Sequence, residues 1–62
     1  MQTVKEYIET LPNKIENTTL INNGISIGTF TPTEAVEKYG DWCYINTHSQ
    51  TDNSVMLLIK NF

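Results

Sequence analysis

The sequence predicts a two-layer α+β domain, in which two short helices pack on an antiparallel sheet of up to four strands in the order α-β-β-α-β-β. Two Thr-x-x-Glu capping boxes each begin an apolar pattern with helical spacing. The pair Asn23-Gly24 lies between β-branched residues and is the strongest short-range signal for a β-hairpin. Two further strand-like runs, separated by a polar segment, end the chain.

The two helices are predicted from their capping boxes. The first box and the apolar residues after it predict a helix over residues 4–11, which Pro12 ends. The second box is followed by proline at the first helical position and predicts a helix over 32–39. Gly40 is placed to supply a left-handed cap at the C-terminal end of this helix.

Residues 18–30 are predicted to form a hairpin around the Asn-Gly turn, in one of two registers. A two-residue loop pairs Leu20 with Ile27, whereas a three-residue loop with a glycine bulge pairs Ile21 with Ile25. A shift of one residue exchanges the buried and solvated faces. The sequence leaves both registers open.

The second hairpin is predicted from strands at residues 42–47 and 55–62, joined by the polar loop 48–54. This loop length places Thr47 opposite Val55. Alternation then puts one set of side chains on the core face, namely Cys43, Ile45, Val55, Leu57 and Ile59. The opposite face carries Trp42, Tyr44, Met56 and Leu58.

This second set is predicted to be an exposed patch with Lys60 at its edge, because two short helices are unlikely to cover both faces of four strands. Aromatic residues and methionine are enriched at protein interfaces. The alternative is that one helix packs on each face, or that the first hairpin folds over the patch. Continuous apolar runs are typical of strands covered on both sides.

The second predicted helix also carries carboxylates on one side. Glu34, Glu37 and Asp41 follow at i, i+3 and i+7 and form one acidic stripe if the helix continues to its cap. Such stripes are usually solvated helix faces. The functional alternative is a surface that binds a basic partner or imitates DNA phosphates, for which a net charge of −3 is small.

The small size and the residue types argue against catalysis, cofactors and metals. A chain of about 60 residues buries only about 60% of its unfolded surface, so little apolar area remains to line an enclosed pocket. Ser26 lies in a Gly-x-Ser-x-Gly pattern, but on a strand rather than on the strand-to-helix turn that serine hydrolases need. Cys43 and His48 are the only soft metal ligands, and a structural zinc site needs about four.

The chain is expected to be a single domain, residues 1–62, in the cytoplasm. Its beginning lacks the basic and apolar regions of a signal peptide, and its longest apolar run, Val55–Ile59, is far shorter than a membrane span. The four lysines are scattered and there is no arginine for bidentate contacts to phosphate or guanine. Direct binding to nucleic acid or to a membrane is therefore not expected.

Two segments resemble short accessory proteins of Gram-positive bacteriophages and mobile elements. Residues 4–12 read Val-Lys-Glu-Tyr-Ile-Glu-Thr-Leu-Pro, and residues 33–41 read Thr-Glu-Ala-Val-Glu-Lys-Tyr-Gly-Asp. The resemblance covers about a third of the chain and transfers no functional residue. It implies a small interaction protein that acts on a host or phage factor, such as an inhibitor of a defence system.

These features together predict a non-catalytic protein-binding or regulatory protein. It is expected to bury the patch of Trp42, Tyr44, Met56 and Leu58 against a protein partner or a second copy of itself as a homodimer. The alternative is an acidic inhibitor, of DNA-mimic or anti-CRISPR type, that uses the carboxylates of the second helix. Added salt should lower the binding affinity of the acidic inhibitor steeply, whereas it should change the affinity of binding through the apolar patch little.

Overall fold

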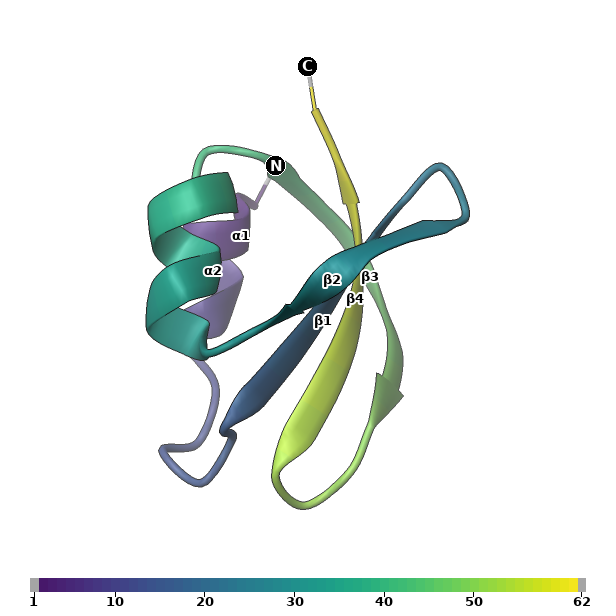
Figure 1. The fold of residues 1–62 in the computed structure, drawn as a ribbon. Helices are drawn as coiled ribbons and strands as arrows, with labels where there is room; N and C mark the ends of the chain where they lie inside the picture. The colour runs from purple at the N-terminus through teal and green to yellow at the C-terminus, as the bar shows by residue number, and fades with distance from the viewer. Residues whose placement is uncertain (1, 62) are drawn as a thin grey trace.

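The computed structural model describes residues 2–61 and contains two helices and four strands. In chain order they are α1 Val4–Ile8, β1 Asn17–Asn22, β2 Ile25–Phe30, α2 Pro32–Tyr39, β3 Cys43–Gln50 and β4 Ser54–Lys60. This α-β-β-α-β-β order confirms the predicted α+β class (Figure 1). Both predicted capping boxes are present, and the bounds of α2 are those predicted.

The four strands form one mixed sheet in the order β2-β1-β4-β3. Each hairpin is antiparallel, but the two central strands, β1 and β4, run parallel to each other. The prediction of a wholly antiparallel sheet is therefore wrong. The reason is that α2 carries the chain from one edge strand to the other, so that β4 returns beside β1 in the same direction (Figure 1).

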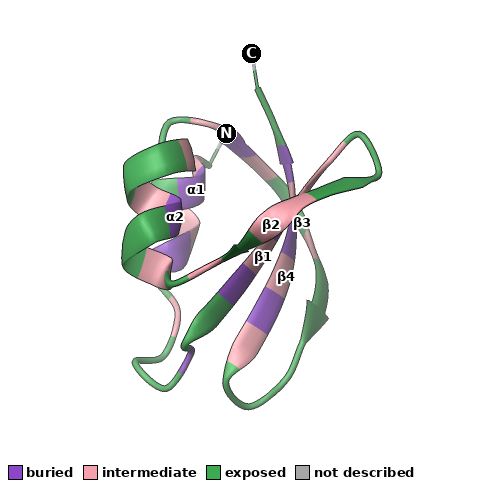
Figure 2. Ribbon diagram, viewed as in Figure 1, coloured by how far each residue is buried: buried purple, intermediate pink, exposed green. Residues whose placement is uncertain are grey.

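Both helices pack on the same face of the sheet, and the core lies between these two layers (Figure 1). Its buried side chains come from the helices, from residue 15 and from the two central strands: Val4, Ile8, Ile15, Leu20, Ala35, Val55, Leu57 and Ile59. Along β4 the buried residues alternate with half-buried ones (Figure 2). Only one face of the sheet therefore belongs to the core.

Helix α1 ends at Ile8, three residues earlier than predicted. The backbone N–H groups of Thr10 and Leu11 donate to carbonyls three residues back, at 3.0 Å each, instead of four. The Thr10 hydroxyl also donates to the Tyr7 carbonyl at 2.6 Å. These bonds tighten the last turn away from α-helical geometry, while Leu11 still packs against the core.

The residue after α2, Gly40, is not the left-handed cap that was predicted. Its φ of −58° and ψ of −30° are ordinary right-handed values. A Cβ atom at this position would overlap the backbone carbonyl of Val36. Glycine is therefore favoured here because a Cβ atom would clash with the backbone of the preceding helical turn.

The turn between β1 and β2 is the two-residue Asn-Gly loop, one of the two alternatives that the sequence leaves open, and it pairs Asn22 with Ile25. Asn23 and Gly24 both have positive φ, 54° and 76°, as a type I′ turn requires. The pairing of Leu20 with Ile27 is nevertheless wrong, because Ile27 is an extra residue in a β-bulge and Leu20 pairs with Gly28.

The hairpin of β3 and β4 is longer than predicted, and its loop contains only residues 51–53. Thr47 pairs with Leu57, and it is Gln50 that pairs with Val55. The predicted loop 48–54 is therefore wrong. A turn closed by the Thr51 backbone N–H, which donates to the Ser54 carbonyl at 2.8 Å, lets the polar residues before it continue the strand.

The N-terminal residues run beside the beginning of β3. Val4 donates its backbone N–H to Trp42 at 2.8 Å, and Tyr44 donates to Gln2 at 2.9 Å. A β-bridge joins Thr3 to Cys43 between these two bonds. This pairing fixes α1 against the edge of the sheet.

Candidate functional site

The face of the sheet opposite the two helices is not covered by any helix or strand of residues 2–61 (Figure 1). Cross-strand pairing places eight side chains on it, because they alternate with the core residues of the same strands. One row consists of Ser26, Ile21, Leu58 and Asn46, and the next consists of Thr29, Thr19, Met56 and Ser49. We call these eight residues the open face.

The open face is apolar at its centre and polar at its sides. The central strands contribute Ile21, Leu58 and Met56, which are half-buried among their neighbours. The edge strands contribute exposed serine, threonine and asparagine side chains. The hydroxyls of Thr19 and Thr29 lie 2.9 Å apart and hydrogen-bond across two strands. None of these eight side chains is ionisable. The nearest charge on this side of the sheet is the exposed Lys60, which follows Met56 and Leu58 in the alternation of β4.

The predicted patch is divided between the two faces of the sheet. Met56 and Leu58 belong to the open face, as predicted. Trp42 and Tyr44 instead pack against the core on the helix side. Tyr44 stacks on Tyr7 of α1 at 4.0 Å between ring centroids, and Trp42 meets Tyr39 of α2 edge-on at 4.9 Å.

A β-bulge in β3 causes this division. Tyr44 pairs with Ile59 and Asn46 pairs with Leu58, so Ile45 is an extra residue between them. An inserted residue reverses the alternation of the strand and brings Tyr44 to the helix side. Ile45, predicted for the core, is instead 55% exposed.

Cys43 was also predicted to lie on the core face. It is buried, but it pairs with Lys60 and with Thr3 and is not part of the main core cluster. Its thiol lies 3.5 Å from the Tyr44 carbonyl, to which it donates. The N-terminal segment, rather than the helices, therefore shelters this side chain.

The three carboxylates predicted as a stripe have different positions and partners. Glu34 closes the capping box of α2, where its Oε1 accepts from the Thr31 backbone N–H at 3.3 Å and from the Thr31 hydroxyl at 3.2 Å. Glu37 is exposed on the helix, and Asp41 lies beyond the end of α2 at Tyr39. The stripe was expected only if the helix continued far enough to include Asp41, and α2 ends before that residue.

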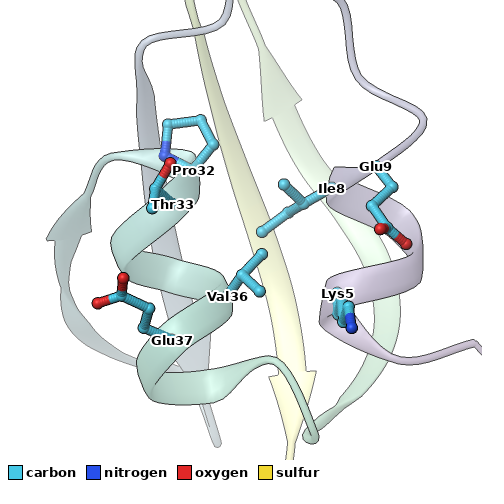
Figure 3. Close-up of a pocket in the computed structure, with 7 residues that line it drawn as sticks. All are labelled: Lys5, Ile8, Glu9, Pro32, Thr33, Val36 and Glu37. Carbon is cyan, nitrogen blue, oxygen red and sulfur yellow. The ribbon is translucent and has the colours of Figure 1, made fainter.

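A shallow groove of about 280 Å³ lies between the two helices. Ile8 and Val36 point toward each other across its floor, while Glu37 extends away along the outer side of α2 (Figure 3). Pro32 and Thr33 form one end, and Lys5 and Glu9 border it on α1. This mixture of one ammonium group, two carboxylates and an apolar floor forms no recognisable catalytic arrangement.

No family model matches the chain, and no curated protein and no solved structure is significantly similar to it.

Ser26, the serine of the Gly-x-Ser-x-Gly pattern, and His48, the one histidine of the sequence, lie on opposite edge strands. β1 and β4 separate them, so their strands are about 14 Å apart. A serine and its general base must approach within hydrogen-bonding distance, so these two cannot form a catalytic pair. Among residues 2–61 there is also no cluster of three or more metal-ligating side chains, and no helix there could cross a membrane.

Sequence reasoning missed Ile21 as the apolar neighbour of Leu58 on the open face. The parallel pairing of β1 with β4 brings the two together, and that pairing joins segments far apart in the chain. The available signal was the continuous apolar run 55–59, which is typical of a central strand with a neighbour on each side.

Proposed function

We propose that this chain is a non-catalytic protein-binding protein whose open face is its interface. The observation that supports this most is the outward side of β4. A strand with one solvated face normally alternates apolar and polar residues, but β4 presents Met56 and Leu58 on the side without helices. An apolar stripe on an uncovered face is typical of a surface with a partner.

The composition of the open face supports this proposal. Interface centres are depleted in charged residues and enriched in methionine, and their margins are polar. The open face has this arrangement, with Ile21, Met56 and Leu58 between exposed hydroxyl and amide groups. Its burial requires the desolvation of no ionised side chain, which would otherwise cost several kcal/mol or need a charged partner group.

The edges of the sheet are less suited to binding by strand addition. β2 has an extra residue at Ile27, and β3 has extra residues at Ile45 and His48. Residues 2–4 already pair with the beginning of β3. Bulges disturb the ladder of free backbone groups that an added strand needs, so a partner is expected on the face.

The rival proposal is an acidic inhibitor that competes with nucleic acid through the helix side. It is favoured by one observation, that all seven carboxylates lie outside the four strands. Such binding would depend on Coulomb attraction and fall steeply as salt is added. Binding by the open face should change little with salt.

The proposal can be tested by capturing partners from the source cell with three forms of the immobilised protein. Ser26→Glu adds a carboxylate to an exposed position of the open face, and Thr33→Glu adds the same charge to an exposed position on α2. We expect one protein to be captured by the wild type and by Thr33→Glu, but not by Ser26→Glu, at low and high salt alike.

Two outcomes would contradict the proposal. One is capture that survives Ser26→Glu unchanged. The other is capture that fades with salt and is strengthened by the added charge of Thr33→Glu, which would favour the acidic helix side. An interaction role of this kind also accords with the resemblance of residues 4–12 and 33–41 to phage accessory proteins, which stays a prediction.

A further inference from the structure

We infer that the open face also binds a second copy of this chain, and that the result is a weak dimer with two-fold symmetry. This inference rests on the proposed function, because it uses the same face. Three features favour a second copy as the partner: the distribution of charge, the self-complementary pattern of the face and its area.

The distribution of charge favours contact between two anionic copies through the open face of the sheet. Each chain carries a net charge of −3, yet the four strands contain a single charged residue, Lys60 near the chain end. Packed sheets lie about 10 Å apart, and each helix layer lies beyond its own sheet. The acidic layers of the two copies are then separated by far more than the screening length of about 8 Å at physiological salt.

Contact through the helices would have the opposite effect. Glu9 and Glu37 border the groove between α1 and α2, and Asp41 follows α2. Lys5 and Lys38 offset only part of the charge of the carboxylates in this layer. A dimer through it would therefore bring two net negative surfaces together, and juxtaposed like charges are unfavourable. Self-association through the open face avoids this repulsion.

The pattern of the open face matches itself under a two-fold rotation. Consider a two-fold axis that lies midway between the two packed sheets, parallel to the strands and level with the gap between β1 and β4. Rotation about this axis leaves each row at the same position along the strands, and it places β1 over β4 and β2 over β3 of the other copy. Ile21 of each copy then lies over Leu58 of the other, and Thr19 lies over Met56. At the margins, Ser26 lies over Asn46 of the second copy.

The area of the face places this dimer at the weak end of the range. Four strands about 4.8 Å apart and about six residues long give a flat area of roughly 400 Å². This is about half of the roughly 800 Å² per partner that a standard stable interface buries. The dimer should therefore exchange rapidly and form in the micromolar to millimolar range of concentration.

Sedimentation equilibrium over a series of concentrations tests this inference, with circular dichroism melts to show that each variant folds. We expect the wild type and Thr33→Glu to dimerise alike, and Ser26→Glu to weaken the dimer at least about tenfold, because its carboxylate loses water against a neutral surface. Ser49→Glu, in the other row and on the other edge strand, should weaken the dimer similarly.

A charge-pair rescue tests the geometry. Ser26→Glu combined with Asn46→Lys in one chain should restore the dimer, because the two-fold rotation brings each new glutamate against a new lysine. Within one copy these positions lie on opposite edge strands, about 14 Å apart by strand spacing, so the pair cannot form there. Failure of the rescue with both single variants folded would overturn the proposed axis.

Failure of the inference can be distinguished from failure of the proposed function. A wild type that stays monomeric at millimolar concentration overturns self-association, while capture of a partner that Ser26→Glu abolishes would still support the open face as an interface. A dimer that only Thr33→Glu disrupts would overturn the use of the open face by a second copy.

Discussion

Among the described residues 2–61, Thr18 is the one fully buried polar residue, and it lies in the core between helices and sheet. It lies on β1 beside Leu20, and its hydroxyl has no hydrogen-bond partner among residues 2–61. A buried hydroxyl without a partner loses its bonds to water and gains none in return. The β-branched shape of the side chain, rather than its polarity, is what suits this position in the strand.

We therefore expect Thr18→Val to stabilise the protein. Valine has nearly the same shape, and removing the unpaired hydroxyl should raise the free energy of unfolding by about 1 kcal/mol. For a domain of this size that corresponds to an increase in Tm of about 4–8 °C. Thr19→Val is the matched control, because its hydroxyl is bonded to Thr29 and its loss should bring no gain. A Tm for Thr18→Val at or below that of the wild type would contradict this account.

Thr47 differs from Thr18 because its hydroxyl has two hydrogen-bond partners. Its hydroxyl lies 2.7 Å from the hydroxyl of Tyr7 and 2.7 Å from that of Tyr44, so it links α1 to β3. Thr47→Val should lower the free energy of unfolding by about 1–2 kcal/mol, because both phenols lose a partner. Thr47→Ser keeps the hydroxyl and should lose less. Urea denaturation measures the difference, and equal losses in the two variants would show that the hydroxyl does not matter.

At the scale of the element, the capping box of α1 makes folding sensitive to acid. The Thr3 backbone N–H donates to Glu6 Oε1 at 2.9 Å, and this bond, with the Thr3 side chain, holds the pKa of Glu6 below its ordinary value. A carboxyl group with a lowered pKa in the folded state stabilises that state above its ordinary pKa. The contribution is lost as the pH falls through the lowered pKa.

Glu6→Gln should therefore reduce the loss of stability on acidification. Glutamine still offers an oxygen to the Thr3 N–H, as capping boxes allow, but it does not titrate. Thermal unfolding of both proteins through the acid range should show a smaller decrease in Tm for the variant. Parallel decreases in the two proteins would mean that other carboxyl groups determine the acid response.

The helices could be predicted from the sequence because their signals are local. Thr31, Pro32 and Glu34 act within one turn, and α2 has the predicted bounds. The faces of the strands could not be predicted, because one extra residue such as Ile45 reverses the alternation. Gly28, with φ of 147°, gave a local signal for the bulge beside it in β2, whereas no residue in β3 indicates its own two bulges.

The difference between local and long-range signals also explains which residues of the candidate site could be predicted. Met56 and Leu58 could be assigned to the uncovered face, because β4 contains no bulge and alternates regularly. Tyr44 could not, because its position depends on the bulge. Ile21 could not either, because it joins the face through the parallel pairing of β1 with β4. That pairing depends on the packing of the whole chain.

At the scale of the molecule, the two sides of the sheet have different roles. The helix side holds the core, the aromatic contacts and the charged residues of both helices, whereas the eight residues of the open face are uncharged and contribute little to the core. Phe30, Tyr39 and Trp42 follow one another along the helix side, with ring centroids 5.7 and 4.9 Å apart. Stability and association should therefore depend on separate sets of residues.

Trp42→Ala tests this separation. The half-buried indole packs against Tyr39 and the core, so its loss should cost about 2 kcal/mol. That is a large part of the roughly 3–9 kcal/mol expected for a domain of 62 residues. We expect Trp42→Ala to have a clearly lower Tm and an unchanged dimerisation constant below the melting range. Ser26→Glu should instead leave Tm nearly unchanged and weaken the dimer. If Trp42→Ala instead abolished association and left Tm unchanged, the indole would belong to the interface, and the division between the two sides of the sheet would be wrong.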